Sequence, residues 1–282
     1  PEEWFQAVLE GLEELNARDV AGISFGGQMH GLVALDREGK VIRPCILWND
    51  GRTEEETAYL NEKVGREKLN AWTGNIAFAG FTAPKLLWMY RHEPENFAKI
   101  DKILLPKDYL AYRFTGEFST DYSDASGTLL LDVKNRCWSE EMCEICHVSK
   151  EQLPALHESY EVIGTMKRSL ADALGYGEVK VCAGAGDNAA AAVGMGVVGE
   201  GGCNVSLGTS GTLFLSSDSF SDVHGKPLHS FCHANGRYHL MGGILSAASC
   251  NSWWMDVLGA KDMDKEQAGC EERMGKNDVF FL

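Results

Sequence analysis

Residues 179–192 of the chain read VKVCAGAGDNAAAA. The apolar run at 179–183 predicts a strand, and the alanine-rich run after Asn188 predicts a helix. Gly184 and Gly186 stand between them, and glycine allows both a sharp turn and the close approach of a ligand to the backbone. Strands and helices mix in the same way along the rest of the chain, which indicates an α/β protein.

Asp187 follows these glycines at the predicted mouth of a helix, where the helix dipole favours its charged form. An ionised carboxylate beside a substrate hydroxyl can accept its proton while the oxygen attacks an electrophile. The structural alternative is a helix N-cap, since Asp and Asn are the usual residues there. From the residues alone, both interpretations stay open.

A second motif is Ser206-Leu207-Gly208-Thr209-Ser210-Gly211, between two apolar runs. Small residues in a tight turn can aim several N–H groups at one point and form an anion-binding nest. A plain hairpin turn needs the same glycines. The spacing fits neither a Walker P-loop nor a Rossmann fingerprint.

A third group combines amide, imidazole, carboxylate and indole side chains, a set that suits a neutral polyol with hydroxyls and a C–H surface. A buried histidine and an ordinary Asp-Gly turn would explain the same pieces separately. The candidate residues are Gln28, Met29, His30, Trp48, Asn49 and Asp50.

Composition restricts the partners. The chain has 282 residues and a formal net charge of −15. Such a surface repels phosphate backbones and anionic lipids, so we expect neither nucleic acid nor membrane partners, and anionic ATP would need backbone amides and a metal ion to dock. The start at Pro1 lacks the basic and apolar regions of a signal peptide, and cytoplasm is the expected location.

Nine cysteines are scattered along the chain and are expected to be reduced thiols. Cys143-Glu144-Ile145-Cys146-His147 has the form of a haem attachment site. Because it falls in a predicted helix over 139–147, a partly buried helix with chance thiols is the favoured interpretation.

Hydrophobic periodicity predicts the remaining elements. The predicted helices cover 4–15, 54–69, 108–114 and a segment starting at Thr82, with a capping box at 149–152; the predicted strands cover 20–25, 32–35, 103–105, 128–133, 203–207, 212–216 and 238–241.

Taken in order, these motifs resemble the xylulokinases of the FGGY carbohydrate kinase family. The blocks that carry the resemblance are Gly27-Gln28-Met29-His30-Gly31, Leu47-Trp48-Asn49-Asp50-Gly51-Arg52, Gly80-Phe81-Thr82-Ala83-Pro84-Lys85-Leu86-Leu87-Trp88, Leu105-Pro106-Lys107-Asp108-Tyr109-Leu110, Gly186-Asp187-Asn188-Ala189-Ala190, Ser206–Gly211, His229–His233 and Leu245–Cys250.

The resemblance implies two ribonuclease H-like domains of the actin and hexokinase type, incomplete here, with sugar and ATP in the cleft between them. It implies that Asp187 is the general base and an Mg²⁺ ligand, and that Gly208, Thr209, Ser210 and Gly211 bind ATP phosphate. The polyol candidates listed above, together with Asn188, would bind the sugar. Because glycerol kinases carry Arg-Glu where Met29-His30 stand, D-xylulose is the expected substrate and a related sugar or polyol the alternative.

The resemblance also implies that residues 1–197 belong to the sugar-binding domain and 198–282 begin the ATP-binding domain. A phosphate loop that the family carries before the position of Pro1, and an adenosine site after Leu282, have no counterpart in the sequence. We therefore expect the chain by itself to be inactive, or to be a non-catalytic sugar-binding remnant. Uncovered sheet edges would favour a homo-oligomer.

Overall fold

The computed structural model describes residues 1–276, and its centre joins segments that lie far apart in the sequence. β1 (Gly22–Ile23) pairs in parallel with β10 (Lys180–Cys182), and β2 (Gly26–Gly27) pairs in parallel with β11 (Ala185–Gly186). β9 (Val162–Thr165) lies antiparallel on the other side of β10. Of the strand predicted over 20–25, only Gly22–Ile23 forms a strand, and β2 follows just after the predicted range.

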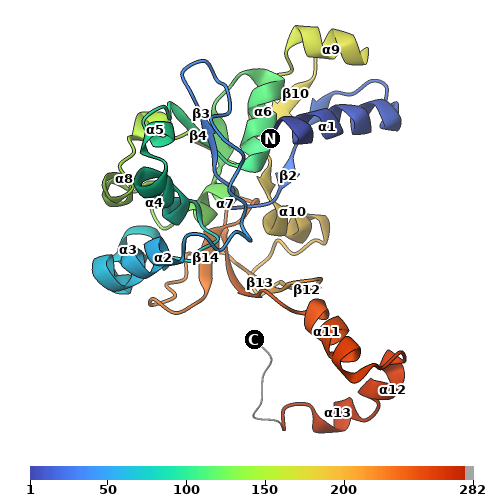
Figure 1. Ribbon diagram of the computed structural model, residues 1–282. Coiled ribbons are helices and arrows are strands. Elements are labelled where there is room, and N and C mark those ends of the chain that lie inside the picture. Colours follow the sequence, from blue (N-terminus) through green and yellow to red (C-terminus); the bar gives the residue numbers. More distant parts are fainter. Residues whose placement is uncertain (277–282) are drawn as a thin grey trace.

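Helices α1 (Glu2–Leu15) and α6 (Pro106–Thr115) lie beside this sheet in Figure 1. Phe5 from α1 and Phe25 from the strand region both contact Phe114 of α6, with ring centroids 5.7 Å and 5.2 Å apart. α1 forms because its apolar residues recur at helical spacing, as predicted, and it ends at Asn16 in the left-handed conformation.

A second group of elements surrounds the largest hydrophobic core. β3 (Val33–Leu35) pairs antiparallel with β4 (Lys102–Leu104), and α4 starts at Thr82 as predicted. The helix expected over 54–69 runs through α2, a π-helical turn η1 and α3, and continues to Thr73. The helices here are α2 (Glu54–Ala58), η1 (Tyr59–Gly65), α3 (Arg66–Thr73), α4 (Thr82–His92) and α5 (Pro94–Phe97).

The middle of the chain contains short elements. The strand predicted over 128–133 is wrong for most of its length, because Leu129 takes a left-handed φ of 61° after a 3₁₀ turn and β6 is confined to two residues. The elements are β5 (Ser119–Asp121), α7 (Tyr122–Ala125), η2 (Ser126–Thr128), β6 (Leu131–Asp132), β7 (Cys137–Trp138), α8 (Glu140–Ile145), η3 (Lys150–Gln152), β8 (Ala155–His157) and α9 (Arg168–Leu174).

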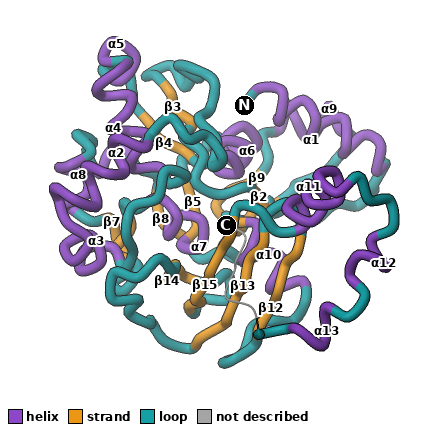
Figure 2. Tube along the Cα trace, turned by 60° about the horizontal axis from the view of Figure 1, so that its bottom comes forward, coloured by secondary structure: helices purple, strands orange, loops and turns teal. Residues whose placement is uncertain are grey.

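The C-terminal part forms an antiparallel sheet in the order β12-β13-β15-β14, seen in Figure 2. The strands are β12 (Cys203–Leu207), β13 (Gly211–Ser217), β14 (His229–Cys232) and β15 (Tyr238–Ile244). After them, α11 (Ala248–Leu258), α12 (Met263–Gln267) and α13 (Cys270–Arg273) extend away from the rest of the chain (Figure 1).

The domain boundary at 197/198 stays a prediction. The four-stranded sheet consists of later residues alone, yet Phe231 of β14 is buried in the core that α4 and β4 share. Asn75 also exchanges two hydrogen bonds with the backbone of Ser230, at 3.0 Å each. The predicted second domain ends in residues outside the described range. Within residues 1–276, no helix is long and apolar enough to cross a membrane.

Candidate active site

The parallel pairing of β2 with β11 places the ends of two predicted motifs side by side. Gly27 is the register partner of Gly186, so Gln28 and Asp187 follow adjacent strand ends. Gly186 holds the N-cap position, and Asp187 is the first residue of α10 (Asp187–Gly194). The N-cap interpretation of Asp187 is therefore wrong by one residue, because Gly186 occupies that position.

Asp187 is exposed, and its Oδ1 accepts hydrogen bonds from the backbone N–H and the side-chain amide of Asn188 at 2.7 Å and 3.0 Å. Oδ2 accepts none from the described residues, and it is free for a ligand. Although the side chain contacts solvent, the surrounding protein desolvates it enough to raise its pKa, and the bonds from Asn188 oppose this. A raised pKa makes a carboxylate a better proton acceptor.

The predicted sugar-binding dipeptide lies next to this turn. Met29 is buried, and a Cβ at Gly186 would lie 3.0 Å from its Cγ and Sδ atoms. His30 has a left-handed φ of 71°, and its ring stacks on Phe81 with centroids 4.8 Å apart. The structure thus brings Met29 to the backbone that carries Asp187.

The tautomer of His30 follows from its surroundings. Nδ1 lies 2.7 Å from the carbonyl oxygen of Gly127, which can only accept, so Nδ1 carries the hydrogen. Burial lowers the His30 pKa to about 3, so the ring is neutral. Its Nε2 is then an unprotonated nitrogen that can accept a hydrogen bond from a hydroxyl.

The Trp48–Asp50 loop joins the site through Lys85. The buried Nζ of Lys85 donates to the carbonyl of His30 at 2.8 Å and to that of Gly80. Gly80 in turn packs on this loop, because a Cβ there would lie 2.8 Å from the Trp48 carbonyl oxygen. Lys85 therefore joins the His30 and Gly80 loops, and the Trp48–Asp50 loop packs on the second of them.

Within that loop, Trp48 is 37% exposed and Asn49 is exposed. Both carboxylate oxygens of Asp50 accept from the Arg52 side chain, at 2.9 Å and 2.7 Å, and these bonds lower the Asp50 pKa. A sugar hydroxyl would have to share Asp50 with Arg52.

The predicted phosphate loop is the hairpin turn between β12 and β13. The N–H groups of Thr209 and Ser210 find no acceptor among the described residues, as an anion-binding nest requires. Thr212, just after the turn, donates to Oδ1 of Asn188 at 3.3 Å, which connects this hairpin to the Asp187 helix. The same loop can therefore be both a hairpin turn and an anion-binding nest.

Lys85 and Gly127 were missed as site residues from the sequence. A lysine directly before the apolar run Leu86-Leu87-Trp88 is a weak signal of a buried amine. Gly127 carried no signal, although a Cβ there would lie 2.4 Å from His30 Nδ1.

The CxxCH motif lies in the core. Cys143 and Cys146 are buried, burial raises the pKa of Cys143 to about 11 and that of Cys146 further, and His147 stacks on Tyr90. Protonated buried thiols are poor metal ligands. Among the described residues, no three acidic, His or Cys side chains form a metal site.

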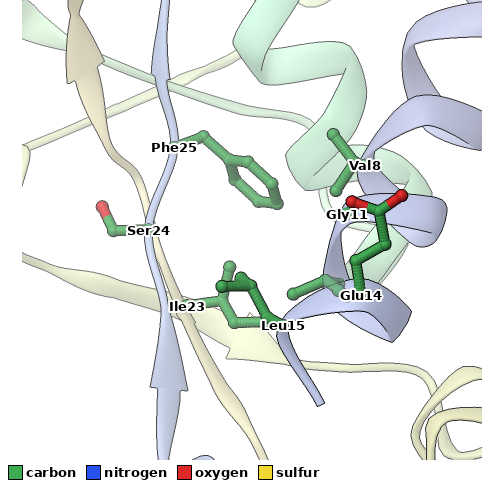
Figure 3. Close-up of a pocket in the computed structure, with 8 residues that line it drawn as sticks. Val8, Gly11, Glu14, Leu15, Ile23, Ser24 and Phe25 are labelled. Atoms are coloured by element: carbon green, nitrogen blue, oxygen red, sulfur yellow. The ribbon is translucent and has the colours of Figure 1, made fainter. Parts of the chain in front are cut away.

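An open, largely apolar hollow of about 620 Å³ lies between α1 and β1. Figure 3 shows Val8 and Phe25 facing each other across it, with Ser24 pointing away. It contains none of the predicted site residues.

Comparison with known proteins identifies the family. The model of the FGGY family of carbohydrate kinases, N-terminal domain, matches residues 1–194. The chain belongs to the FGGY family of carbohydrate kinases. Xylulose kinases of Escherichia coli K12 and Klebsiella pneumoniae are each 47% identical to it, over 100% and 92% of the chain.

Solved FGGY kinases confirm the incomplete ribonuclease H-like fold. The xyloylose kinase from Brucella ovis superimposes with a TM-score of 0.84 at 44% identity, covering 91% of this chain and 52% of its own. The gluconate kinase from Lactobacillus acidophilus gives 0.87 at 26% identity, covering 93% and 54%. The chain spans 59% and 54% of the two curated relatives.

Proposed function

We propose that this FGGY chain carries the sugar-binding part of a kinase that converts D-xylulose and ATP into D-xylulose 5-phosphate and ADP. The observation that carries the proposal is the pairing of β2 with β11. It places the segment Gln28–His30 beside Asp187 with a free carboxylate oxygen on the base. The identity to xylulose kinases supports the choice of sugar.

In the proposed reaction, Nε2 of His30 accepts a hydrogen bond from the sugar and helps to orient it. Asp187 accepts the proton of the C5 hydroxyl as its oxygen bonds to the γ-phosphorus of ATP. The bond between that phosphorus and the β,γ-bridging oxygen breaks, and ADP leaves with the electron pair. Phosphoryl transfer depends mainly on such positioning and on charge neutralisation.

Two features fit ATP and Mg²⁺. The free N–H groups of Thr209 and Ser210, together with Gly208 and Gly211, would bind phosphate oxygens. Mg²⁺ usually keeps several waters and binds one or two carboxylates plus substrate phosphates. Asp187 fits one such ligand, and Mg²⁺ would neutralise charge on the phosphates.

The proposal is tested by calorimetric titration of D-xylulose, glycerol and gluconate, and by a coupled kinase assay with Mg²⁺-ATP. We expect selective binding of D-xylulose. If the unmodified protein is active in the kinase assay, Asp187→Asn should lower its kcat about 10²- to 10⁴-fold, as loss of a general base does. Asp172→Asn, an exposed carboxylate on α9, is the matched control.

Other outcomes separate the alternatives. Stronger binding of glycerol or gluconate would assign a related sugar or polyol. Sugar binding without phosphate transfer in any preparation would assign a non-catalytic sugar-binding protein. No binding of D-xylulose, glycerol or gluconate would overturn the proposal.

We further infer a cytoplasmic location. A homo-oligomer remains a proposal, supported by exposed apolar residues on the four-stranded sheet, among them Val205, Leu213 and Ile244. Light scattering at several concentrations would measure the oligomeric state.

A further inference from the structure

A buried ionic network lies directly behind the turn that leads to Asp187. Nζ of Lys107 lies 2.6 Å from Asp108, 3.0 Å from Asp121 and 3.7 Å from Asp124. All four side chains are at most 1% exposed. Replacing buried ion pairs by well-packed apolar residues is often neutral or stabilising, so such pairs add little stability by themselves. The network is therefore expected to do more than fill space.

Two hydrogen bonds connect this network to the turn between β10 and α10. Lys107 Nζ donates to the carbonyl of Ala183 at 3.3 Å, where the turn begins. Where it ends, the N–H of Gly186 donates to Oγ of Ser123 at 3.1 Å. Ser123 Oγ donates in turn to Oδ2 of Asp121 at 2.5 Å. One network thus holds both ends of the turn.

The turn needs such support. Gly184 has a φ of 78°, and β2 and β11 pair over only two residues each. Asp187 directly follows Gly186, so a rotation of the Gly186 backbone would re-aim the carboxylate. A misplacement of about 1 Å can cost about 10²-fold in rate.

We propose that Ser123, fixed by Asp121 and Lys107, is a positioning residue that aims the Asp187 carboxylate at the sugar hydroxyl. The proposal rests on the proposed function of Asp187 as base. Ser123 contacts no reacting atom, and it acts through the N–H group of Gly186.

The chain offers a matched control. Ser159 Oγ donates to the same Oδ2 of Asp121, at 2.6 Å. Its contact with the turn is made by its backbone, since its carbonyl accepts from the N–H of Gly184 at 3.0 Å. Ser159→Ala therefore removes a hydrogen bond to Asp121 but keeps the backbone bond from Gly184. Ser123→Ala removes a hydrogen bond to Asp121 and also the bond from the N–H of Gly186.

The test compares Ser123→Ala, Ser159→Ala and the unmodified chain. Amide hydrogen exchange of residues 184–188, followed by mass spectrometry, reports the turn without any need for activity. We expect Ser123→Ala to lower Tm more than Ser159→Ala, because it also leaves the buried N–H of Gly186 without an acceptor, and only Ser123→Ala to speed exchange in this segment. If the unmodified protein is an active kinase, Ser123→Ala should lower kcat roughly 10- to 100-fold. Its KM for D-xylulose should stay within about twofold of that of the unmodified protein.

Equal exchange and equal kcat in the two variants would overturn the proposal. If the unmodified protein phosphorylates no sugar, the proposed function fails, while the exchange comparison still decides whether Ser123 holds the turn. If Ser123→Ala does not fold, Ser123→Cys keeps a polar atom at the γ position and weakens both hydrogen bonds, because a thiol is a weak donor and acceptor. The same exchange result is then required of it.

Discussion

Lys85 illustrates how one buried residue organises the candidate sugar site. Its ammonium group satisfies two carbonyls, of His30 and Gly80, and no carboxylate of the described residues forms an ion pair with it. Burial therefore lowers its pKa to about 7, with Asp50 opposing the shift. The carbonyl of His30 also accepts from Thr82 Oγ1 at 3.1 Å, so the strained His30 backbone is held from two sides.

The Lys85 amine should give a distinct pH dependence of stability. Because its pKa is lower in the folded than in the unfolded protein, the unfolded state binds more protons between about pH 7 and pH 10.5. The stability of the unmodified protein should rise with pH in that window relative to Lys85→Met. Urea denaturation at pH 7 and pH 9.5 measures this, with exposed Lys40→Met as control. Parallel profiles of Lys85→Met and the unmodified protein would contradict it.

At the scale of elements, the turn between β10 and α10 depends on the absence of a side chain. A Cβ at Gly184 would lie 2.2 Å from the carbonyl oxygen of Phe25, and its φ is in the left-handed region. Because the contact is with backbone, no side chain can move aside to relieve it.

We expect Gly184→Ala to lower the free energy of unfolding by more than the roughly 1–3 kcal/mol that left-handed strain alone costs. Gly194→Ala, at the other end of α10, meets nothing within 4 Å and should raise it by about 0.5–1 kcal/mol. Chemical denaturation measures both. A Gly184→Ala protein as stable as the parent would show that the turn can relax.

At the scale of the whole molecule, aromatic rings join the two parts of the chain. His229 of β14 packs against Phe78 and Phe81, with centroids 4.8 Å and 5.4 Å apart. Behind it, His239 of β15 stacks on Phe214 at 4.1 Å, and neither of its ring nitrogens is within hydrogen-bonding geometry of a partner among residues 1–276. Burial lowers the pKa of His229 to about 4 and that of His239 well below its usual value.

These histidines should make the molecule sensitive to acid. Their pKa values are lower in the folded state, so stability is full above about pH 6.5 and is lost as the pH falls toward 4. His239→Phe keeps an aromatic ring but cannot take up a proton. It should flatten the slope of stability against pH, because up to one fewer proton is taken up on unfolding. Urea denaturation from pH 7 to pH 4.5 tests this. A slope in His239→Phe equal to that of the unmodified protein would contradict the prediction.

Local signals predicted much of the secondary structure. The periodicity of α1, the proline near the start of α4 and the hairpin of β12 and β13 are properties of neighbouring residues, and all three were predicted. The strand at 128–133 failed because Leu129 adopts a left-handed backbone that apolar patterning does not reveal.

The sequence by itself determined the α/β class, the order of the motifs and the family that they indicate, because short-range patterns and residue types carry that information. Only the tertiary structure decided which groups meet. The pairing of Gly27 with Gly186, the tautomer of His30 and the bond from Gly186 to Ser123 all join segments far apart in the chain. The burial that shifts the pKa of Lys85 and of the histidines likewise exists only once those segments have packed together.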